Sequence, residues 1–268
     1  MNEEAARVLY RGMPPGGLRR KIAIVTGASR RQGIGAMLCR VLAASGVDVL
    51  FTHWQPFDRE QSYGADEEGP GVLLRELQEA GVRAVALNVD LSTPVAPSLV
   101  LETTHRQIGA PSILINNAAH WSPAGLDDLD AAVLDAHYYV NVRAMALLSA
   151  EFARRFTGGS GGRIVNLTSG QRIGAMPDQL AYAATKGAVE AFTLSFAAAV
   201  ADRGITVNAV DPGATDTGWM TEDVKSRLAE QMLMGRVGQP LDVARLILFL
   251  ASDAGGWITG QVLHSRGM

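Results

Sequence analysis

The chain has 268 residues, a net charge of −3 at pH 7 and a single cysteine. This length fits one large domain with a sizeable core, and the slightly acidic balance argues against a nucleic acid or an anionic membrane as the main partner. One cysteine excludes a disulfide within the chain and fits a reducing cytoplasm, and no apolar run is long enough to span a membrane.

Residues 1–20 are polar, contain glycine and proline, and lack the apolar stretch of a signal peptide. We expect a loose tail there and a single domain over 21–268. Cys39 lies among apolar residues of a predicted helix, so we expect it to fill the core rather than to react.

A glycine-rich turn follows the first predicted strand. The apolar run 21–26 is typical of a buried parallel strand, and 36–45 has a helical pattern. Gly27, Gly33 and Gly35 lie between them. This order is the context of a dinucleotide site, because glycines admit a pyrophosphate and the helix N-terminus offers free N–H groups. Ordinary turns between strands and helices also contain glycine, so the motif is not decisive alone.

The second predicted strand, 47–52, bears on the choice of cofactor. Sites that prefer NAD place an acidic residue near the end of this strand to bind the ribose 2′-OH, but the first carboxylate after it is Asp58. Arg30 and Arg31 lie in the glycine loop, where their charges suit a 2′-phosphate; the alternative is that both face solvent. We therefore predict NADP(H) in preference to NAD(H).

The segment 53–70 is polar and without periodicity, so we expect a long loop that forms either a cofactor lid or a surface insertion. Asp90, after the third predicted strand, either accepts a hydrogen bond from the adenine amino group or caps the helix near Thr93. The segment 214–234 mixes methionines with charges, and we expect it to cover the site. The remaining predicted elements are helices at 72–80, 99–108, 129–156, about 182–202 and 241–252, and strands at 83–90, 112–117, 163–168, 205–210 and 260–264.

Strands alternate with helices throughout, with no linker. The pattern predicts a single α/β domain with a Rossmann fold: a doubly wound, seven-stranded, mainly parallel sheet with helices on both faces. Asn141 interrupts the long helix 129–156, where an asparagine amide competes for backbone hydrogen bonds. We expect a local distortion or a water site there.

Tyr182 and Lys186 are four residues apart, which places both side chains on one face of a helix. An ammonium close to a phenol lowers its pKa from about 10 and makes it a usable general acid or base. Ser169 ends the preceding strand, where its hydroxyl can orient a carbonyl oxygen. The same spacing also arises where a tyrosine only packs a helix.

Taken together, these motifs resemble the short-chain dehydrogenase/reductase family, and in particular its bacterial 3-oxoacyl-acyl-carrier-protein reductases. The resemblance covers about 21–260. Its motifs are the T-G-x-x-x-G-x-G loop from Thr26, the N-N-A of 116–118, the P-G-x-x-x-T of 212–217 and the C-terminal signature from Arg236 to Gly260.

The resemblance implies a catalytic tetrad of Asn141, Ser169, Tyr182 and Lys186, with the usual thirteen residues from Ser169 to Tyr182. In that tetrad Asn141 anchors a water of the proton relay, and Lys186 also holds the nicotinamide ribose. The residues it implies for cofactor binding are Gly27, Ser29, Arg30, Arg31, Gly33, Ile34, Gly35, His53, Asp90, Leu91, Asn117, Ala118, Tyr182, Lys186, Pro212, Gly213, Thr215 and Thr217.

Three departures from the family pattern stand out. The glycine loop is two residues longer, through Arg31 and Gln32, and Ala119 replaces the usual last glycine of N-N-A-G. His120 follows it, as a pocket-lining residue or else as a substrate ligand or second proton carrier. The usual Asp-Gly-Gly ending is replaced by 265–268, which we expect to affect subunit contacts rather than catalysis.

We therefore expect an NADP(H)-dependent oxidoreductase that transfers a hydride between nicotinamide and a carbonyl or secondary alcohol, such as a 3-oxoacyl thioester or a related ketone. The alternatives are an NAD-dependent sugar or secondary-alcohol dehydrogenase and a non-catalytic dinucleotide-binding sensor. We expect a small-molecule substrate, no metal, and a homotetramer or homodimer. Side chains that suggest an apolar substrate pocket are Trp121, Met176, Trp219, Met220, Met232 and Met234.

Overall fold

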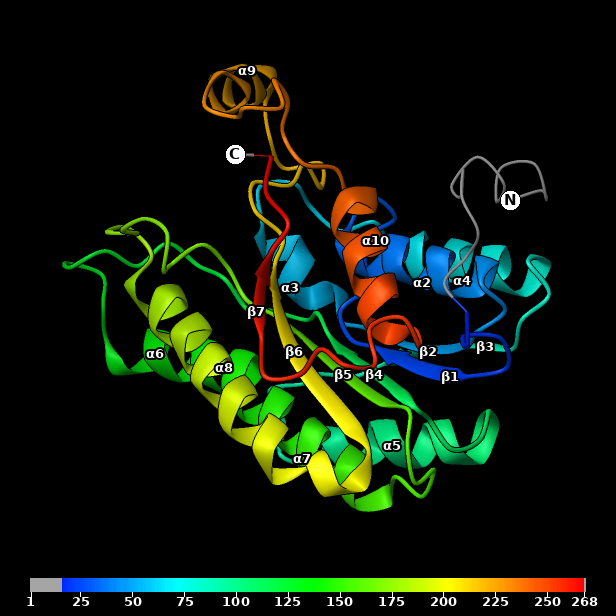
Figure 1. The fold of residues 1–268 in the computed structure, drawn as a ribbon. Coiled ribbons are helices and arrows are strands. Elements are labelled where there is room, and N and C mark those ends of the chain that lie inside the picture. The colour runs from blue at the N-terminus through cyan, green and yellow to red at the C-terminus, as the bar shows by residue number, and fades with distance from the viewer. Residues whose placement is uncertain (1–15, 268) are drawn as a thin grey trace.

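The computed structural model describes residues 16–267, which contain one seven-stranded sheet in the order β3-β2-β1-β4-β5-β6-β7 (Figure 1). Every neighbouring pair of strands is parallel. This confirms the predicted doubly wound sheet. The strands are β1 (Ile22–Val25), β2 (Asp48–His53), β3 (Ala84–Asn88), β4 (Ile113–Asn116), β5 (Gly162–Leu167), β6 (Ile205–Asp211) and β7 (Val262–His264).

Helices cover both faces of this sheet (Figure 1). One face carries α2 (Ile34–Ala44), α4 (Gly69–Glu79) and α10 (Pro240–Ala251), and the other carries α5 (Ala96–Gln107), α7 (Met145–Arg155) and α8 (Leu180–Ala199). The remaining helices are α3 (Gln55–Glu60), α6 (Ala131–Tyr138), α9 (Glu222–Glu230), the π-helix η1 (Tyr139–Ala144) and the 3-10 turn η2 (Ala201–Arg203).

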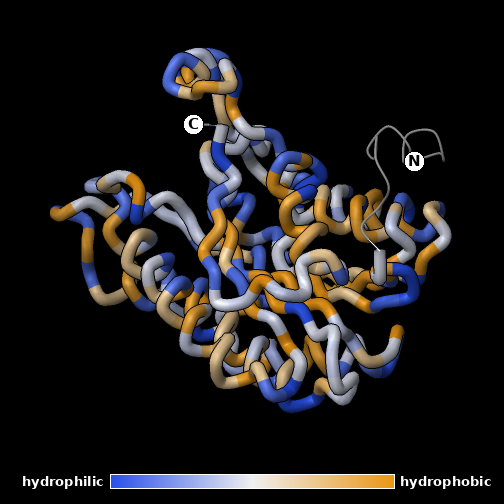
Figure 2. Tube along the Cα trace, viewed as in Figure 1, coloured by the Kyte–Doolittle hydropathy of each residue, from blue (hydrophilic) through white to orange (hydrophobic). Residues whose placement is uncertain are grey.

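Two apolar clusters, one on each side of the sheet, hold these layers together, and hydrophobic residues concentrate along the strands (Figure 2). Parallel strands buried on both faces need such a core. Cys39 is fully buried in the first cluster, as predicted. Of the predicted tail, residues 1–15 lie outside the described chain, whereas Leu18 packs into the same cluster.

Two segments differ from the expectation, and a third confirms it. The predicted loop 53–70 contains the short helix α3, whose first turn includes Pro56; six residues are too few to show a helical period. The long helix 129–156 is interrupted by η1, so Asn141 does mark a local distortion. The segment 214–234 was expected to cover the site, but its helix α9 has no buried residue and projects from the body (Figure 1).

The ends of β1 and β4 are tied together beneath the glycine loop. The Asn117 side chain donates to the carbonyl oxygens of Thr26 and Gly27, both at 2.8 Å, and the amides of Asn117 and Ala118 donate to the Thr26 hydroxyl at 3.0 Å. Gly27 has a φ of +74°, and a Cβ there would lie 2.6 Å from the Ala118 Cα. This turn therefore requires glycine.

Replacing Asn117 with alanine should lower the free energy of unfolding by about 1–3 kcal/mol, because two carbonyl groups beneath the turn lose their donors. Urea denaturation measures the loss. Asn88→Ala, at an exposed position at the end of β3, is the control and should change stability by less than about 0.5 kcal/mol. Equal effects of the two substitutions would contradict the role of the Asn117 tie.

Candidate active site

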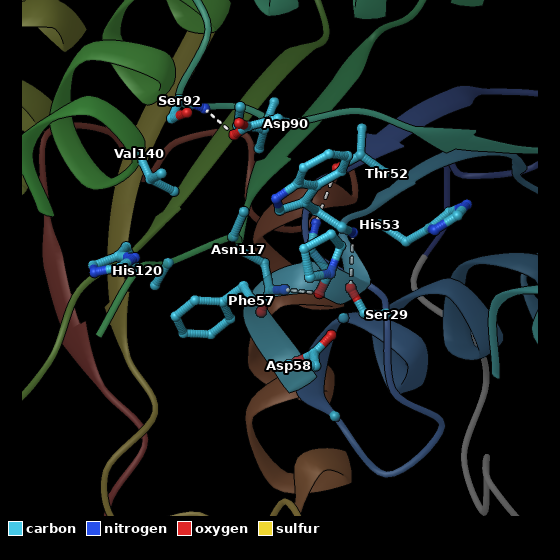
Figure 3. A pocket seen from close by; sticks show the side chains of 18 of the residues that line it. Ser29, Thr52, His53, Phe57, Asp58, Asp90, Ser92, Asn117, His120 and Val140 are labelled. Carbon is cyan, nitrogen blue, oxygen red and sulfur yellow. Dashed lines mark hydrogen bonds between the residues drawn. The ribbon is translucent and has the colours of Figure 1, made fainter. Parts of the chain in front are cut away.

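A cavity of about 740 Å³ opens at the carboxyl ends of the strands, where open parallel sheets bind ligands (Figure 3). Of the predicted cofactor residues, twelve line it: Gly27, Ser29, Arg30, Gly33, Ile34, Gly35, His53, Asp90, Leu91, Asn117, Ala118 and Thr217. The other predicted site residues are not among its lining: Arg31, Asn141, Ser169, Tyr182, Lys186, Pro212, Gly213 and Thr215.

The extended glycine loop and the 53–70 insertion pack on each other. The Arg31 guanidinium makes a bidentate pair with Asp66, at 2.7 and 3.0 Å, on the outside of the cavity. Arg30 lies 3.8 Å from the centre of the Tyr63 ring. The insertion is thus a wall of the cavity and the partner of Arg31, one of the two extra loop residues.

Arg30 bridges three parts of the chain. Its guanidinium donates to the Thr217 carbonyl at 3.0 Å and the Thr217 hydroxyl at 3.4 Å, and its Nε lies 3.6 Å from an Asp58 carboxylate oxygen. Arg30 therefore faces the cavity as predicted for a 2′-phosphate ligand, whereas the pair with Asp66 holds Arg31 away from it.

Asp58 is a cavity residue that the sequence analysis did not select (Figure 3). It is 5% exposed, shares a hydrogen bond with Ser29, and its Oδ2 has no hydrogen-bond partner among residues 16–267. Burial raises the pKa of this carboxyl, and the charge of Arg30 opposes the rise. The sequence signal was present, since Asp58 is the first carboxylate after β2, but its helix was not predicted.

These residues fit a dinucleotide. Gly35, like Gly27, has no space for a side chain, since a Cβ there would lie 2.3 Å from the Gly27 carbonyl oxygen, so the N-terminus of α2 packs directly on the glycine turn. Like Asp58 Oδ2, His53 Nδ1 is buried without a partner in the described chain. Both unpaired atoms belong to cavity residues beside the end of β2, where a ribose is bound in such folds.

Asp90 orders the turn after β3 rather than capping the helix that follows, because the N-cap residue of α5 is Val95. Its Oδ1 accepts a hydrogen bond from the Ser92 amide at 2.8 Å, and its backbone oxygen accepts from the Thr93 hydroxyl at 2.9 Å. It also lines the cavity. The carboxylate therefore orders the turn after β3 and still faces the space for a ligand.

Ser169 and Tyr182 meet beyond the end of β5. Their side chains share a hydrogen bond, and Lys186 Nζ lies 5.5 Å from the centre of the Tyr182 ring. Contrary to the expectation from the spacing, the pKa of Tyr182 is raised, to about 12, because burial outweighs the hydrogen bond from Ser169 and the Asp211 charge adds to the rise. The phenol is therefore protonated at neutral pH.

The amine of Lys186 points to the strand rather than to the phenol. Nζ donates to the Leu167 carbonyl oxygen at 2.7 Å, and burial lowers the pKa of Lys186 to about 8. An ammonium has three protons to donate, so this bond leaves others for a ligand.

Asn141 clamps the loop after β4. Its side chain accepts from the His120 amide at 2.7 Å and donates to the His120 carbonyl at 3.0 Å and to the Thr185 hydroxyl at 3.1 Å. Both amide hydrogens are therefore used within the protein. These hydrogens are therefore not available for the water that the resemblance implies at Asn141. The side chain instead joins η1 to α8 through its hydrogen bond to Thr185.

A row of rings links the cavity to Tyr182. The His120 ring is 5.3 Å from Phe57, which lies beside it in Figure 3. It is also 4.8 Å from the His137 ring, which is 6.5 Å from the Tyr182 ring. Burial, together with His137, lowers the pKa of His120 to about 4. This ring is neutral near pH 7, which favours the predicted lining role over that of a proton carrier.

The predicted apolar substrate residues do not gather into the described cavity. Met220 is buried, but Trp219 and Met234 are 49% and 71% exposed. Trp121 donates to the Gln179 side chain at 3.1 Å. Between residues 16 and 267, no helix is long and apolar enough to cross a membrane, and no cluster of three His, Cys, Asp or Glu side chains could hold a metal.

Known proteins match this chain along most of its length. Residues 27–267 match the family model described as enoyl-(acyl carrier protein) reductase. The uncharacterized oxidoreductase YjdA of Bacillus subtilis (strain 168) is 48% identical over 249 residues, covering 92% of this chain and 96% of that protein. The 3-oxoacyl-acyl-carrier-protein reductase FabG of Pseudomonas aeruginosa is 32% identical over 259 residues, covering 93% and 97%.

A solved structure agrees with these relatives. A blue fluorescent protein from a metagenomic library, in complex with NADPH, is 30% identical with a TM-score of 0.83, covering 93% of this chain and 98% of that chain. The chain belongs to the short-chain dehydrogenase/reductase family, as its motifs predicted. It is an oxidoreductase that depends on a nicotinamide cofactor.

Lys186 should make stability depend on pH. Between its folded pKa of about 8 and its ordinary value of 10.5, the unfolded chain binds more protons, so the free energy of unfolding rises with pH. The rise from this residue is roughly 3 kcal/mol. Urea denaturation across this pH range measures the free energy of unfolding. Its rise with pH should be smaller by that amount in Lys186→Met than in the unmodified protein. The same pH dependence in both proteins would contradict the buried amine.

Proposed function

We propose that this enzyme reduces a ketone with NADPH, and that Tyr182 donates the proton. The observation that carries the proposal is the meeting of a protonated phenol, a serine hydroxyl and a buried amine at the end of β5. The 3-oxoacyl thioester reductase among its relatives supports a 3-oxoacyl thioester or a related ketone as substrate.

Each side chain of this group has a distinct task. Bound NADPH supplies the hydride to the carbonyl carbon. Ser169 orients the carbonyl oxygen and Tyr182 transfers its proton to that oxygen as negative charge develops. Lys186 adds positive charge 5.5 Å from the centre of the phenol ring, and the protons that it does not donate to Leu167 hold a ligand hydroxyl.

For the cofactor we propose NADP(H) over NAD(H). Arg30 faces the cavity beside the end of β2, and a guanidinium binds phosphate by charge-assisted hydrogen bonds. The NADPH complex of the metagenomic relative supports this preference. Arg31 is then a structural residue, since Asp66 already pairs with it outside the cavity.

Asp58 favours a second candidate, an NAD-dependent dehydrogenase of a sugar or secondary alcohol. Its unpaired oxygen suits a ribose 2′-OH and would repel a 2′-phosphate. The relative affinities for NADPH and NADH decide between the two candidates. A dinucleotide-binding protein without catalytic activity would not require the Ser169 hydroxyl, the Tyr182 phenol and the Lys186 amine together at the end of β5.

We also propose a cytoplasmic homotetramer or homodimer. Large apolar side chains are exposed on the outer helices and near β7, including Leu147, Leu194 and Trp257, the last 97% exposed. Contact between copies would cover them. Size-exclusion chromatography with light scattering measures the assembly, and a monomer at working concentrations would contradict it.

Replacing Tyr182 with phenylalanine should lower kcat by about 10²–10⁴-fold, because the proton donor is lost while the ring remains. NADPH binding, followed by the cofactor's fluorescence, should stay within about twofold. Tyr138→Phe, at a 49% exposed position, is the matched control and should retain full activity. Turnover by Tyr182→Phe at the wild-type rate on a panel of ketones and acyl thioesters would remove the assignment.

Arg30→Ala should weaken NADPH binding by about 10–100-fold and NADH binding much less, since a charged hydrogen bond to phosphate is lost. Arg31→Ala is the control and should leave both affinities within about threefold. Asp58→Asn should strengthen NADPH binding, because a carboxylate no longer competes for Arg30. It should weaken NADH binding, because the charged acceptor for the ribose 2′-OH is lost. Clear NADH preference in the unmodified protein would support the dehydrogenase instead.

A further inference from the structure

A buried carboxylate on α8 has no task in the proposed reaction. Glu190 lies one helical turn after Lys186 and is buried. Its Oε1 accepts a hydrogen bond from Gln171 Nε2 at 2.6 Å and lies 3.1 Å from the Thr168 hydroxyl. A buried carboxylate needs such donors, because burying an unpaired charge is costly. Both donors belong to the segment that carries Ser169, so one oxygen of this carboxylate contacts that segment twice.

These contacts lie on both sides of Ser169 in the chain. Thr168 precedes it, and the Thr168 hydroxyl also lies 3.2 Å from the Lys186 carbonyl oxygen. Its single hydrogen serves either this carbonyl or the carboxylate. Gln171 follows the serine by two residues, and its Nε2 also donates to the Thr168 hydroxyl at 3.3 Å. The backbone on either side of the serine is therefore attached to α8.

The turn after the serine is closed by two internal hydrogen bonds. The amides of Ile173 and Gly174 donate to the Gly170 carbonyl oxygen at 2.9 and 3.1 Å. Neither bond reaches α8. Arg172 Nη1 lies 3.5 Å from Glu190 Oε2, but the arginine side chain is 65% exposed, so this pair adds little. The carboxylate therefore ties the turn to the helix by its buried hydrogen bonds.

Gln171 keeps its position at a cost in stability. Its Oε1 is buried and has no hydrogen-bond partner among residues 16–267. Turning the amide over would place this oxygen against the Glu190 carboxylate, so the carboxylate fixes the orientation of the amide. A buried acceptor without a partner is destabilising. This cost favours a functional reason for the tie over a purely structural one.

We propose that Glu190 and Gln171 are positioning residues that hold the Ser169 hydroxyl in place. Tyr182 and Lys186 belong to α8, whereas Ser169 belongs to the turn after β5. The geometry of the three groups therefore depends on how the turn is attached to the helix, and Glu190 attaches it from the helix that carries the phenol. The inference rests on the proposed function, in which Ser169 orients the carbonyl oxygen that Tyr182 protonates.

The first test is kinetic. Gln171→Met keeps the size of the side chain and removes its donor, so it should lower kcat for ketone reduction by about tenfold, because the Ser169 hydroxyl is misplaced. NADPH binding should stay within about twofold. Glu190→Met should act in the same way, whereas Glu190→Gln retains an acceptor oxygen and should keep kcat within about threefold. Gln171 is half-buried, so its variant carries the test if Glu190→Met fails to fold.

A double-mutant cycle separates positioning from a general loss of structure. In a Ser169→Ala background the hydroxyl is absent, so adding Gln171→Met should change kcat by less than about twofold. The same tenfold loss in both backgrounds would overturn the proposal. Thr193→Val is the matched control, because this buried threonine on α8 also binds β5, accepting from Asn166 Nδ2 at 2.9 Å. It should lower stability and leave kcat within about twofold.

Hydrogen–deuterium exchange of the turn tests the tie without turnover. In the full-length protein without substrate, the amides of Ile173 and Gly174 should exchange about tenfold faster in Gln171→Met and at the unmodified rate in Thr193→Val. Unchanged exchange in Gln171→Met would overturn the tie. Faster exchange with unmodified kcat would refute the positioning role alone. Faster exchange in a protein that reduces no ketone or thioester would refute the proposed function and, with it, the purpose of the tie.

Discussion

The hydrogen bond from the Lys186 amine to the Leu167 carbonyl is the contact on which the active site depends. It fixes α8 against the end of β5, and it thereby also sets the positions of Ser169 and Tyr182, which are close to Leu167 and Lys186 in the sequence. Ser169 lies two residues beyond Leu167, and Tyr182 lies one helical turn before Lys186. Burying an ammonium is costly unless it is hydrogen-bonded, so the contact both compensates that cost and orients the helix.

The parallel sheet brings the rest of the site to the same edge. The tie of Asn117 to Thr26 and Gly27 leaves the glycine turn open in front of α2. The insertion then closes the far side of the cavity through Asp58 and Tyr63, which both contact Arg30. A segment that looks like a surface addition is therefore part of the cofactor wall, and it explains how the longer glycine loop is accommodated.

The sequence predicted all seven strands and most helices, because buried parallel strands and long helices leave clear patterns. It also predicted the meeting of Ser169 with Tyr182 and the distortion at Asn141. It could not predict α3, which is too short to show a period, nor the position of Asp58 within it. The raised pKa of Tyr182 was missed for another reason: spacing reveals a neighbouring amine, but not the burial that outweighs it.

The central claim is that a hydride passes from the nicotinamide ring to a carbonyl carbon while a phenol supplies the proton. Its most direct test uses NADPH that carries deuterium on the transferred position of the ring, with ketones and acyl thioesters as substrates and mass spectrometry of the products. The account predicts that deuterium appears on the new carbinol carbon. Alcohol products without the label, or no product from any of the carbonyl compounds, would contradict it.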